Sequence, residues 1–221
     1  MTALPDTDEP EYSSLAGKAY AAIRDRLIML DIPPMTAIDD VALARSLEVG
    51  RTPVREALKH LEVDRLVVSY PRRGTFATGV DITDLAYISD IRVQLEPLAA
   101  RRAAESASAA TLAGIAELAD ALDGVDVATL DRDTLMRWDL HVHRAVYSAA
   151  GNPHLEDTLI RYDNLATRIF CLFLDRMSHF DQHVGEHVDL LRAIAERRPD
   201  EAEERAREHV IGFEKAIRAV V

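Results

Sequence analysis

The pattern of apolar and polar positions predicts two unlike parts of the chain. Up to about residue 79, short apolar stripes of helical period are followed by two runs rich in β-branched and aromatic residues. From Asp81 onward, alanine, leucine and charged residues repeat with helical period, and almost no strand signal remains. We therefore expect a mainly α protein, with a disordered polar tail at 1–12, an N-terminal domain at 13–79 and an all-helical antiparallel bundle at 80–221.

The N-terminal domain is predicted to hold three helices and a hairpin. Ser13 or Ser14 can cap a first helix, which "DIPP" ends because proline cannot continue a helix. Asp39 or Asp40 can cap a second, short helix. After the third helix, "LVVSY" and "TFAT" are typical of two short strands joined by the turn "PRRG". This order is that of a winged helix-turn-helix.

The third helix begins in "GRTPVREALKHL", where Thr52 suits the N-cap and Pro53 the first helical position. One predicted face of this helix is apolar, and it consists of Val54, Ala57, Leu58 and Leu61. Arg51, Arg55 and Lys59 follow a different face at intervals of four. On a helix standing alone, such spacing usually marks only a solvated face.

Charge makes this basic face more informative. The chain has a formal net charge of −12, yet residues 45–73 hold seven basic residues against four acidic ones. A short helix precedes the basic helix and an Arg72-Arg73-Gly74 wing follows it, and the three together favour duplex DNA as the target. The segment has no aromatic platform on which single-stranded bases could stack.

The segment "LARSLEVGRTPVREALKHLEVDRLVVSYPRRGTFAT" resembles the DNA-binding domain of GntR-family bacterial transcription regulators, and "RTPVREAL" matches the family pattern intact. Two positions depart from that pattern: Gly50 stands where a serine or threonine is usual, and Asp64 where glycine is common. The resemblance implies that the DNA contacts come from Arg45, Arg51, Thr52, Pro53, Arg55, Arg72, Arg73 and Gly74.

In the second part we expect helices at about 82–106, 110–122, 128–149, 153–177, 180–197 and 200–219. Asp139 and His143 are four residues apart and share one helix face, while His187 and His209 lie on the last two helices. A carboxylate and three imidazoles could hold a divalent metal. By spacing alone the signal is weak, because eight histidines give many chance pairs, His183 with His187 among them.

This part resembles the FCD effector domain of the FadR-type branch of the same family, through "WDLHVHRAVYSAAGNPHL" and "GEHVDLLRAIAERRPDEAEERAREHV". The resemblance implies that Asp139, His143, His187 and His209 bind the metal, with zinc first and nickel, iron or manganese as alternatives. The segment "IRVQLEPLAARRAAE" resembles the first helix of that domain, which implies that Arg92 binds the carboxylate of a small organic acid effector. A surface salt bridge is the alternative for Arg92. The other histidines, expected to be bystanders, are His141, His154, His179 and His183.

We therefore expect a homodimeric repressor that binds a pseudo-palindromic operator in double-stranded DNA and responds to an effector. The single cysteine, Cys171, fits a reducing cytoplasm, and neither a secretory signal nor a membrane span is predicted. The alternative is a metal-dependent enzyme that uses the Asp/His site. A third possibility is a regulator whose bundle binds its ligand without metal, or whose metal is purely structural.

Overall fold

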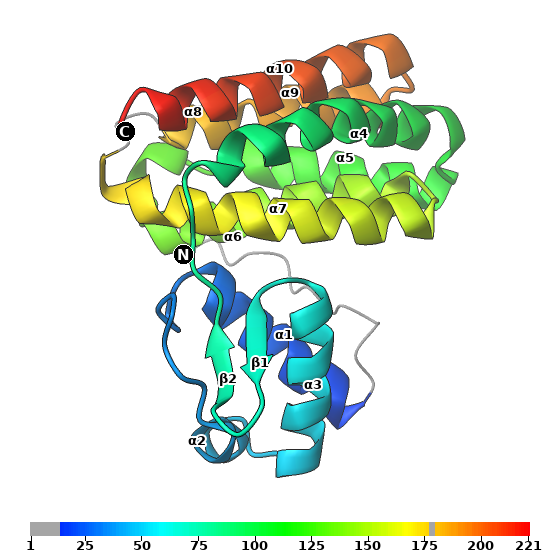
Figure 1. Cartoon of the computed structure of the whole chain (residues 1–221). Helices are drawn as coiled ribbons and strands as arrows, with labels where there is room; N and C mark the ends of the chain where they lie inside the picture. The colour runs from blue at the N-terminus through cyan, green and yellow to red at the C-terminus, as the bar shows by residue number, and fades with distance from the viewer. Residues whose placement is uncertain (1–13, 177–179) are drawn as a thin grey trace. The chain divides into compact units, whose positions relative to one another are not determined.

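The computed structural model describes residues 14–176 and 180–221, so the predicted tail at 1–12 lies outside the described part (Figure 1). The chain divides into two compact units. The first runs to Asp81 and also includes Thr167–Cys171, and the second comprises Ile82–Ala166 and Leu172–Val221.

The first unit is a winged helix-turn-helix built from three helices and a hairpin. The helices are α1 (Leu15–Ile28), α2 (Asp40–Ser46) and α3 (Arg51–Val63), and the strands are β1 (Val67–Tyr70) and β2 (Gly74–Ala77). Side-chain oxygens of Ser14 and Asp39 cap α1 and α2 by accepting backbone N–H groups of the first turn. The apolar stripe of α3 is buried as predicted, and α3 packs against α1, α2 and β1.

The start of α3 differs from the prediction by two residues. Gly50, in extended conformation, is the N-cap, and Thr52 and Pro53 are the second and third residues of the helix. The first four N–H groups of a helix have no intrahelical acceptor, so proline at the third position removes no hydrogen bond. Gly50 also has no side chain to cap the helix, and the first N–H groups of α3 receive no side-chain cap.

The wing is an antiparallel hairpin in which Tyr70 pairs with Gly74. Its turn needs left-handed backbone at Arg72 (φ 63°) and Gly74 (φ 93°), a conformation that glycine adopts without cost. Residues 36–38 lie along the outer side of β2, where the Ile38 N–H donates to the Thr75 carbonyl at 2.9 Å. The turn itself leaves the side chains of Arg72 and Arg73 exposed.

The second unit is all-helical over its described residues, as predicted. Its helices are α4 (Asp84–Ser106), α5 (Ala109–Asp123), α6 (Arg132–Ala149), α7 (Pro153–Phe173), α8 (Phe180–Gly185), α9 (His187–Ala195) and α10 (Pro199–Arg218), with short 3-10 turns η1 (Val127–Thr129) and η2 (Leu174–Arg176). Within α7, Thr167–Cys171 group with the first unit. Helix α4 packs chiefly along α10 and also contacts α6 and α9, while α5 packs against α9 (Figure 1).

Three predicted helices of this unit have different limits in the structure. The one expected at 153–177 ends at Phe173 and is followed by the 3-10 turn η2. The helix expected at 180–197 is two helices, α8 and α9, separated at Glu186, next to Gly185, whose helix propensity is low. The helix expected at 128–149 begins at Arg132, because Asp131 caps it by accepting the Thr134 N–H at 2.8 Å. The break before α9 makes His187 the first residue of that helix.

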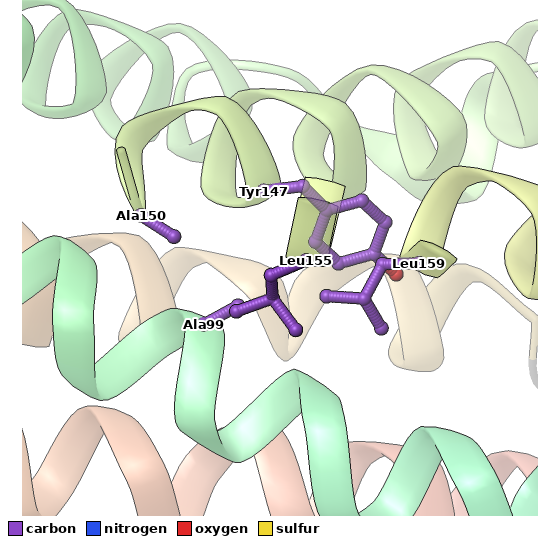
Figure 2. Close-up of a cluster of buried hydrophobic side chains, with 5 residues drawn as sticks. All are labelled: Ala99, Tyr147, Ala150, Leu155 and Leu159. Atoms are coloured by element: carbon purple, nitrogen blue, oxygen red, sulfur yellow. The ribbon is translucent and has the colours of Figure 1, made fainter. Parts of the chain in front are cut away.

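In one apolar cluster of the second unit, the C-terminal end of α6 and the first turns of α7 pack against α4. Figure 2 shows its members, which are Ala99, Tyr147, Ala150, Leu155 and Leu159. The ring of Tyr147 is buried in this cluster, and its hydroxyl is hydrogen-bonded to Nδ1 of His143 at 3.2 Å. The hydrophobic core therefore fixes a side chain that contacts a predicted metal ligand.

Candidate functional site

The basic residues predicted to contact DNA, and Lys59 beside them, lie on the exposed surface of the first unit. Arg51, Arg55 and Lys59 are exposed on α3, on a different face from the buried apolar stripe. Arg45 is exposed in the last turn of α2, and the two arginines of the wing turn are exposed as well. The predicted DNA-contacting arginines are thus all available to an external partner.

A carboxylate that the sequence reasoning did not assign lies between two of these arginines. Oδ2 of Asp40 accepts a hydrogen bond from Nε of Arg55 at 2.7 Å, and both oxygens of Asp40 lie 3.2 Å from Nη2 of Arg51. The hydrogen bond from Arg55 is the main cause that lowers the pKa of Asp40, so this carboxylate is charged at neutral pH.

The second unit brings the four predicted metal ligands together. Asp139 and His143 come from α6, His187 from the start of α9, and His209 from α10, and all four are buried. One potential ligand atom of each lies within 4.8 Å of the other three. Four residues from three helices thus converge on one point inside the bundle.

Of three distances between these ligand atoms, one equals the separation expected in a tetrahedral zinc site and the two that involve Asp139 are about 0.5 Å longer. Nε2 of His143 lies 3.3 Å from Nε2 of His209, and Oδ1 of Asp139 lies 3.9 Å from Nε2 of His143 and 3.8 Å from Nε2 of His187. A zinc ion with bonds of about 2.0–2.1 Å has ligands separated by roughly 3.3–3.4 Å in a tetrahedral site. Among the described residues, Oδ1 of Asp139 and Nε2 of His187 are buried without a hydrogen-bond partner. Buried polar atoms of this kind normally have a partner, and a metal would supply one.

Neighbouring carboxylates favour the ring tautomers that a metal site requires. Nδ1 of His143 lies 3.4 Å from Oε2 of Glu96, and Nδ1 of His209 lies 3.6 Å from Oε2 of Glu186. A carboxylate beside Nδ1 favours a proton on that nitrogen and leaves the lone pair on Nε2. The two Nε2 atoms are the ones that face each other, so their lone pairs point at the proposed ion.

His183, expected to be a bystander, packs against the site. Its ring stacks on that of His209, with ring centroids 4.0 Å apart and planes 20° apart, and its Nε2 lies 3.9 Å from Oδ1 of Asp139. His183, Glu186 and His209 also come close enough to form a second group of potential ligands. A metal lies near the plane of each imidazole that binds it, so two stacked rings cannot both direct a lone pair at one ion. His183 therefore lies beside the four predicted ligands, with its ring against that of His209.

Burial keeps these rings neutral. The four rings of the histidine cluster (His143, His183, His187 and His209) all have pKa values below the ordinary value of 6.5, and desolvation by burial is the first cause for each. The pKa of His187 is about 4. Neutral imidazole is the form that binds a metal, so the cluster is ready to coordinate at neutral pH without first losing protons.

Arg92 lies in the interior of the second unit and already has two carboxylate partners. Its guanidinium donates from Nε to Glu96, and its Nη2 lies 3.3 Å from Oδ1 of Asp163. Burial is the largest single influence and would lower the pKa of Arg92. The charges of Glu96, Tyr147 and Asp163 and the hydrogen bond to Glu96 together outweigh it, so the pKa is raised. The alternative of a surface salt bridge for Arg92 is wrong, because this side chain is buried. Glu96 contacts both Arg92 and His143, so it connects the arginine to the metal site.

The metal-free protein should lose stability as the pH falls from about 6.5 to about 4. The unfolded chain protonates its imidazoles below pH 6.5, whereas the buried rings of the histidine cluster stay neutral, so unfolding takes up four protons. Two buried carboxyl groups, Asp139 and Asp163, have raised pKa values and release protons on unfolding, which offsets part of this uptake. The net uptake makes acid favour the unfolded state, by on the order of 2 kcal/mol per pH unit at the steepest point.

Thermal unfolding followed by circular dichroism in the presence of a chelator, from pH 7.5 to 4.5, measures this effect. The exposed His154 provides the matched control, because His154→Gln should leave the pH dependence unchanged. A melting temperature that is constant over this range would contradict the prediction.

A winged helix-turn-helix joined to an all-helical unit is the architecture of two-domain DNA-binding regulators. Two family models match the chain: "Bacterial regulatory proteins, gntR family" over residues 15–77 and "FCD domain" over residues 87–212. The chain belongs to the GntR family of bacterial regulatory proteins and carries an FCD domain.

Its relatives are transcriptional regulators. The chain is 24% identical to the HTH-type transcriptional repressor RspR of Escherichia coli (strain K12), over 91% of this chain and 88% of RspR. It is 28% identical to the HTH-type transcriptional regulator YdhC of Bacillus subtilis (strain 168), over 87% of this chain and 84% of YdhC. The solved structure of E. coli McbR/YncC has the same fold, with a TM-score of 0.80 and 20% identity over 93% of this chain and 98% of that one.

The protein is therefore a DNA-binding transcriptional regulator and not an enzyme. Within the described residues, no helix has both the length and the apolar character needed to cross a membrane.

Proposed function

We propose that the protein is a cytoplasmic, homodimeric repressor whose FCD domain binds a divalent metal and a small organic acid, and that the acid changes the affinity for a pseudo-palindromic operator. The proposed DNA binding rests on one observation about α3. One face of this helix is buried in the first unit, and another face exposes Arg51 and Arg55. The second helix of a helix-turn-helix motif, which is α3 here, enters the major groove of DNA. The two subunits of a dimer then contact two half-sites. Two relatives, RspR and GlaR, are named as repressors.

The phosphate and base contacts are proposed to divide among the exposed residues. Arg51 and Arg55 on α3 are the candidates for base contacts, because an arginine can donate two hydrogen bonds to one guanine. Arg45, together with Thr52 and Pro53 at the start of α3, is proposed to contact the backbone there. The wing residues Arg72, Arg73 and Gly74 are proposed to contact phosphate beside the groove.

The metal is proposed to be held by Asp139, His143, His187 and His209, with zinc first and nickel, iron or manganese as alternatives. When bound, it supplies a positive centre to which the carboxylate of an effector can attach. Glu96 and Glu186 hold two of the imidazoles in the required tautomer, through the contacts at Nδ1.

Arg92 is proposed to bind the effector carboxylate by exchanging one of its present partners. Asp163 is the weaker of the two, because burial raises its pKa to about 6, so that it accepts a proton more readily than an ordinary aspartate. An effector can alter operator binding only if its affinity differs between the DNA-competent and the DNA-incompetent state. Exchange at Arg92 would provide such a difference, because it frees Asp163 and changes how α4 is held to α7.

Binding to the DNA upstream of the protein's own gene tests the proposal. We expect the purified protein to bind a fluorescent duplex from this region at least about 1,000-fold more tightly than a scrambled duplex, with an affinity that falls steeply as salt rises. Fluorescence anisotropy at several salt concentrations measures both quantities. Small organic acids added to the zinc-loaded protein should then weaken binding to the upstream duplex. Equal affinity for the two duplexes would contradict the DNA-binding part, and a lack of response to any acid would contradict the effector part.

A further inference from the structure

We propose that Asp40 is a positioning residue for base recognition: it holds the guanidinium of Arg55 so that the outer edge of this group binds two acceptors of one guanine. The inference rests on the proposed DNA-binding function and adds a specificity determinant to it. It also gives a role to Asp40, whose negative charge on a DNA-binding surface would otherwise be expected only to repel DNA.

The hydrogen-bonding pattern selects a particular edge of Arg55. Asp40 accepts from Nε of Arg55 at 2.7 Å. A guanidinium held through Nε still has the edge formed by Nη1 and Nη2, whose two parallel donors match O6 and N7 of guanine in the major groove. An interaction with both terminal nitrogens would instead have consumed the donors that contact a base.

Asp40 itself is well placed to act as a fixed support. It is the first residue of α2, and the preceding Asp39 caps this helix by accepting the N–H groups of Val41 and Ala42 at 2.9 and 3.0 Å. The side chain of Asp40 is 22% exposed, whereas those of Arg51 and Arg55 are 54% and 61% exposed. The carboxylate is thus the less mobile partner, and it restrains two long side chains that would otherwise sample many rotamers.

Stability does not account for this arrangement. Ion pairs between exposed side chains contribute little to the free energy of folding, since solvent screens them. Orientation is the larger effect, because an arginine whose rotamer is already fixed loses less entropy when it binds DNA. The negative charge also offsets part of the positive charge of Arg51 and Arg55, which weakens binding to phosphate at any sequence. Both effects raise the ratio of specific to non-specific affinity.

Asp40→Asn tests the inference with two duplexes. The first is the duplex that the wild-type protein enriches from a randomised pool, and the second is a duplex of the same length without the enriched sequence. We expect Asp40→Asn to bind the second duplex as tightly as the wild type or a few-fold more tightly, which also shows that the variant is folded. The ratio of the two affinities should fall by about tenfold, and selection with the variant should lose preference at one guanine in each half-site.

Glu56→Gln is the matched control. Glu56 is exposed on α3 and next to Arg55 in the chain, so its substitution removes the same charge from the same surface. It should change both affinities by a similar factor and leave the ratio within about twofold of the wild-type value. In an Arg55→Ala background, Asp40→Asn should lower the ratio by less than it does in the wild type, because the effect exerted through Arg55 is already lost and only the contact with Arg51 remains.

The outcomes separate this inference from the proposed function. A wild-type protein that enriches no sequence would overturn both. Sequence-specific binding by the wild type together with an unchanged ratio in Asp40→Asn would overturn the role of Asp40 alone. A rise in the ratio would show that Asp40 competes with DNA for the arginines, which is the opposite of the proposed role.

Discussion

Arg55→Ala should lower the affinity for the enriched duplex by about 100-fold or more. The substitution removes the two donors proposed to contact one guanine in each half-site, and each such pair supplies roughly 1–3 kcal/mol of discrimination. It also removes one positive charge per subunit, so the dependence of affinity on salt should become less steep. In the structure the side chain of Arg55 is exposed and its hydrogen bond to Asp40 lies at the surface, so folding should be unaffected.

Fluorescence anisotropy with the enriched and the scrambled duplex measures the loss. Arg205→Ala removes the same charge from α10 in the second unit and should change neither affinity by more than about twofold. Lys59→Ala removes a charge from α3 itself and should weaken binding to both duplexes alike. If Arg55→Ala binds the enriched duplex as the wild type does, α3 is not the helix that contacts the bases.

Local patterns predicted the helix-turn-helix well because each of its elements is marked by nearby residues. The spacing of Val54, Leu58 and Leu61 determines which face of α3 is buried, and the structure confirms it. The predicted start of α3 was wrong because Thr52 and Pro53 are both acceptable at more than one position of the first helical turn. The contact between Asp40 and Arg55 could not be predicted from the sequence, since it depends on how α2 packs against α3.

The metal site shows a similar limit. Asp139 and His143 share a helix face, so their proximity follows from a spacing of four. His187 and His209 lie on other helices, and only the family resemblance selected them from the remaining histidines. The same resemblance left His183 as a bystander, whereas in the structure its ring stacks on that of His209.

The surroundings of Arg92 were predictable only in part. Glu96 is four residues further along α4, a spacing that favours an ion pair within one helix. Asp163 comes from α7, and no local pattern indicates that it completes the pair. The resemblance implied an arginine open to a ligand, and the structure shows one with two carboxylate partners. This difference is the reason for proposing that the effector exchanges with Asp163.

Zinc should raise the melting temperature of the chelator-treated protein by about 10 °C, and a chelator should reverse the change. A ligand that binds only the folded state stabilises it by about 4 kcal/mol at 1,000 times its dissociation constant, and a protein of this size gains roughly 2–4 °C per kcal/mol. The structural reason is that Oδ1 of Asp139 and Nε2 of His187 are buried without hydrogen-bond partners among the described residues, so the metal-free site is costly. Differential scanning calorimetry measures the shift, and native mass spectrometry counts the ions bound per chain.

Three substitutions show whether this stabilisation comes from the proposed site. His187→Gln should abolish the zinc-dependent shift, whatever its effect on the metal-free protein, because each variant is compared with itself with and without zinc. Glu96→Gln should weaken zinc binding by about 10–100-fold and so reduce the shift, because Glu96 no longer favours the metal-binding tautomer of His143. His154→Gln, at an exposed position on α7, should leave the shift unchanged. Zinc binding that survives His187→Gln would place the ion elsewhere, and a wild-type protein that zinc does not stabilise would exclude these four residues as a zinc site.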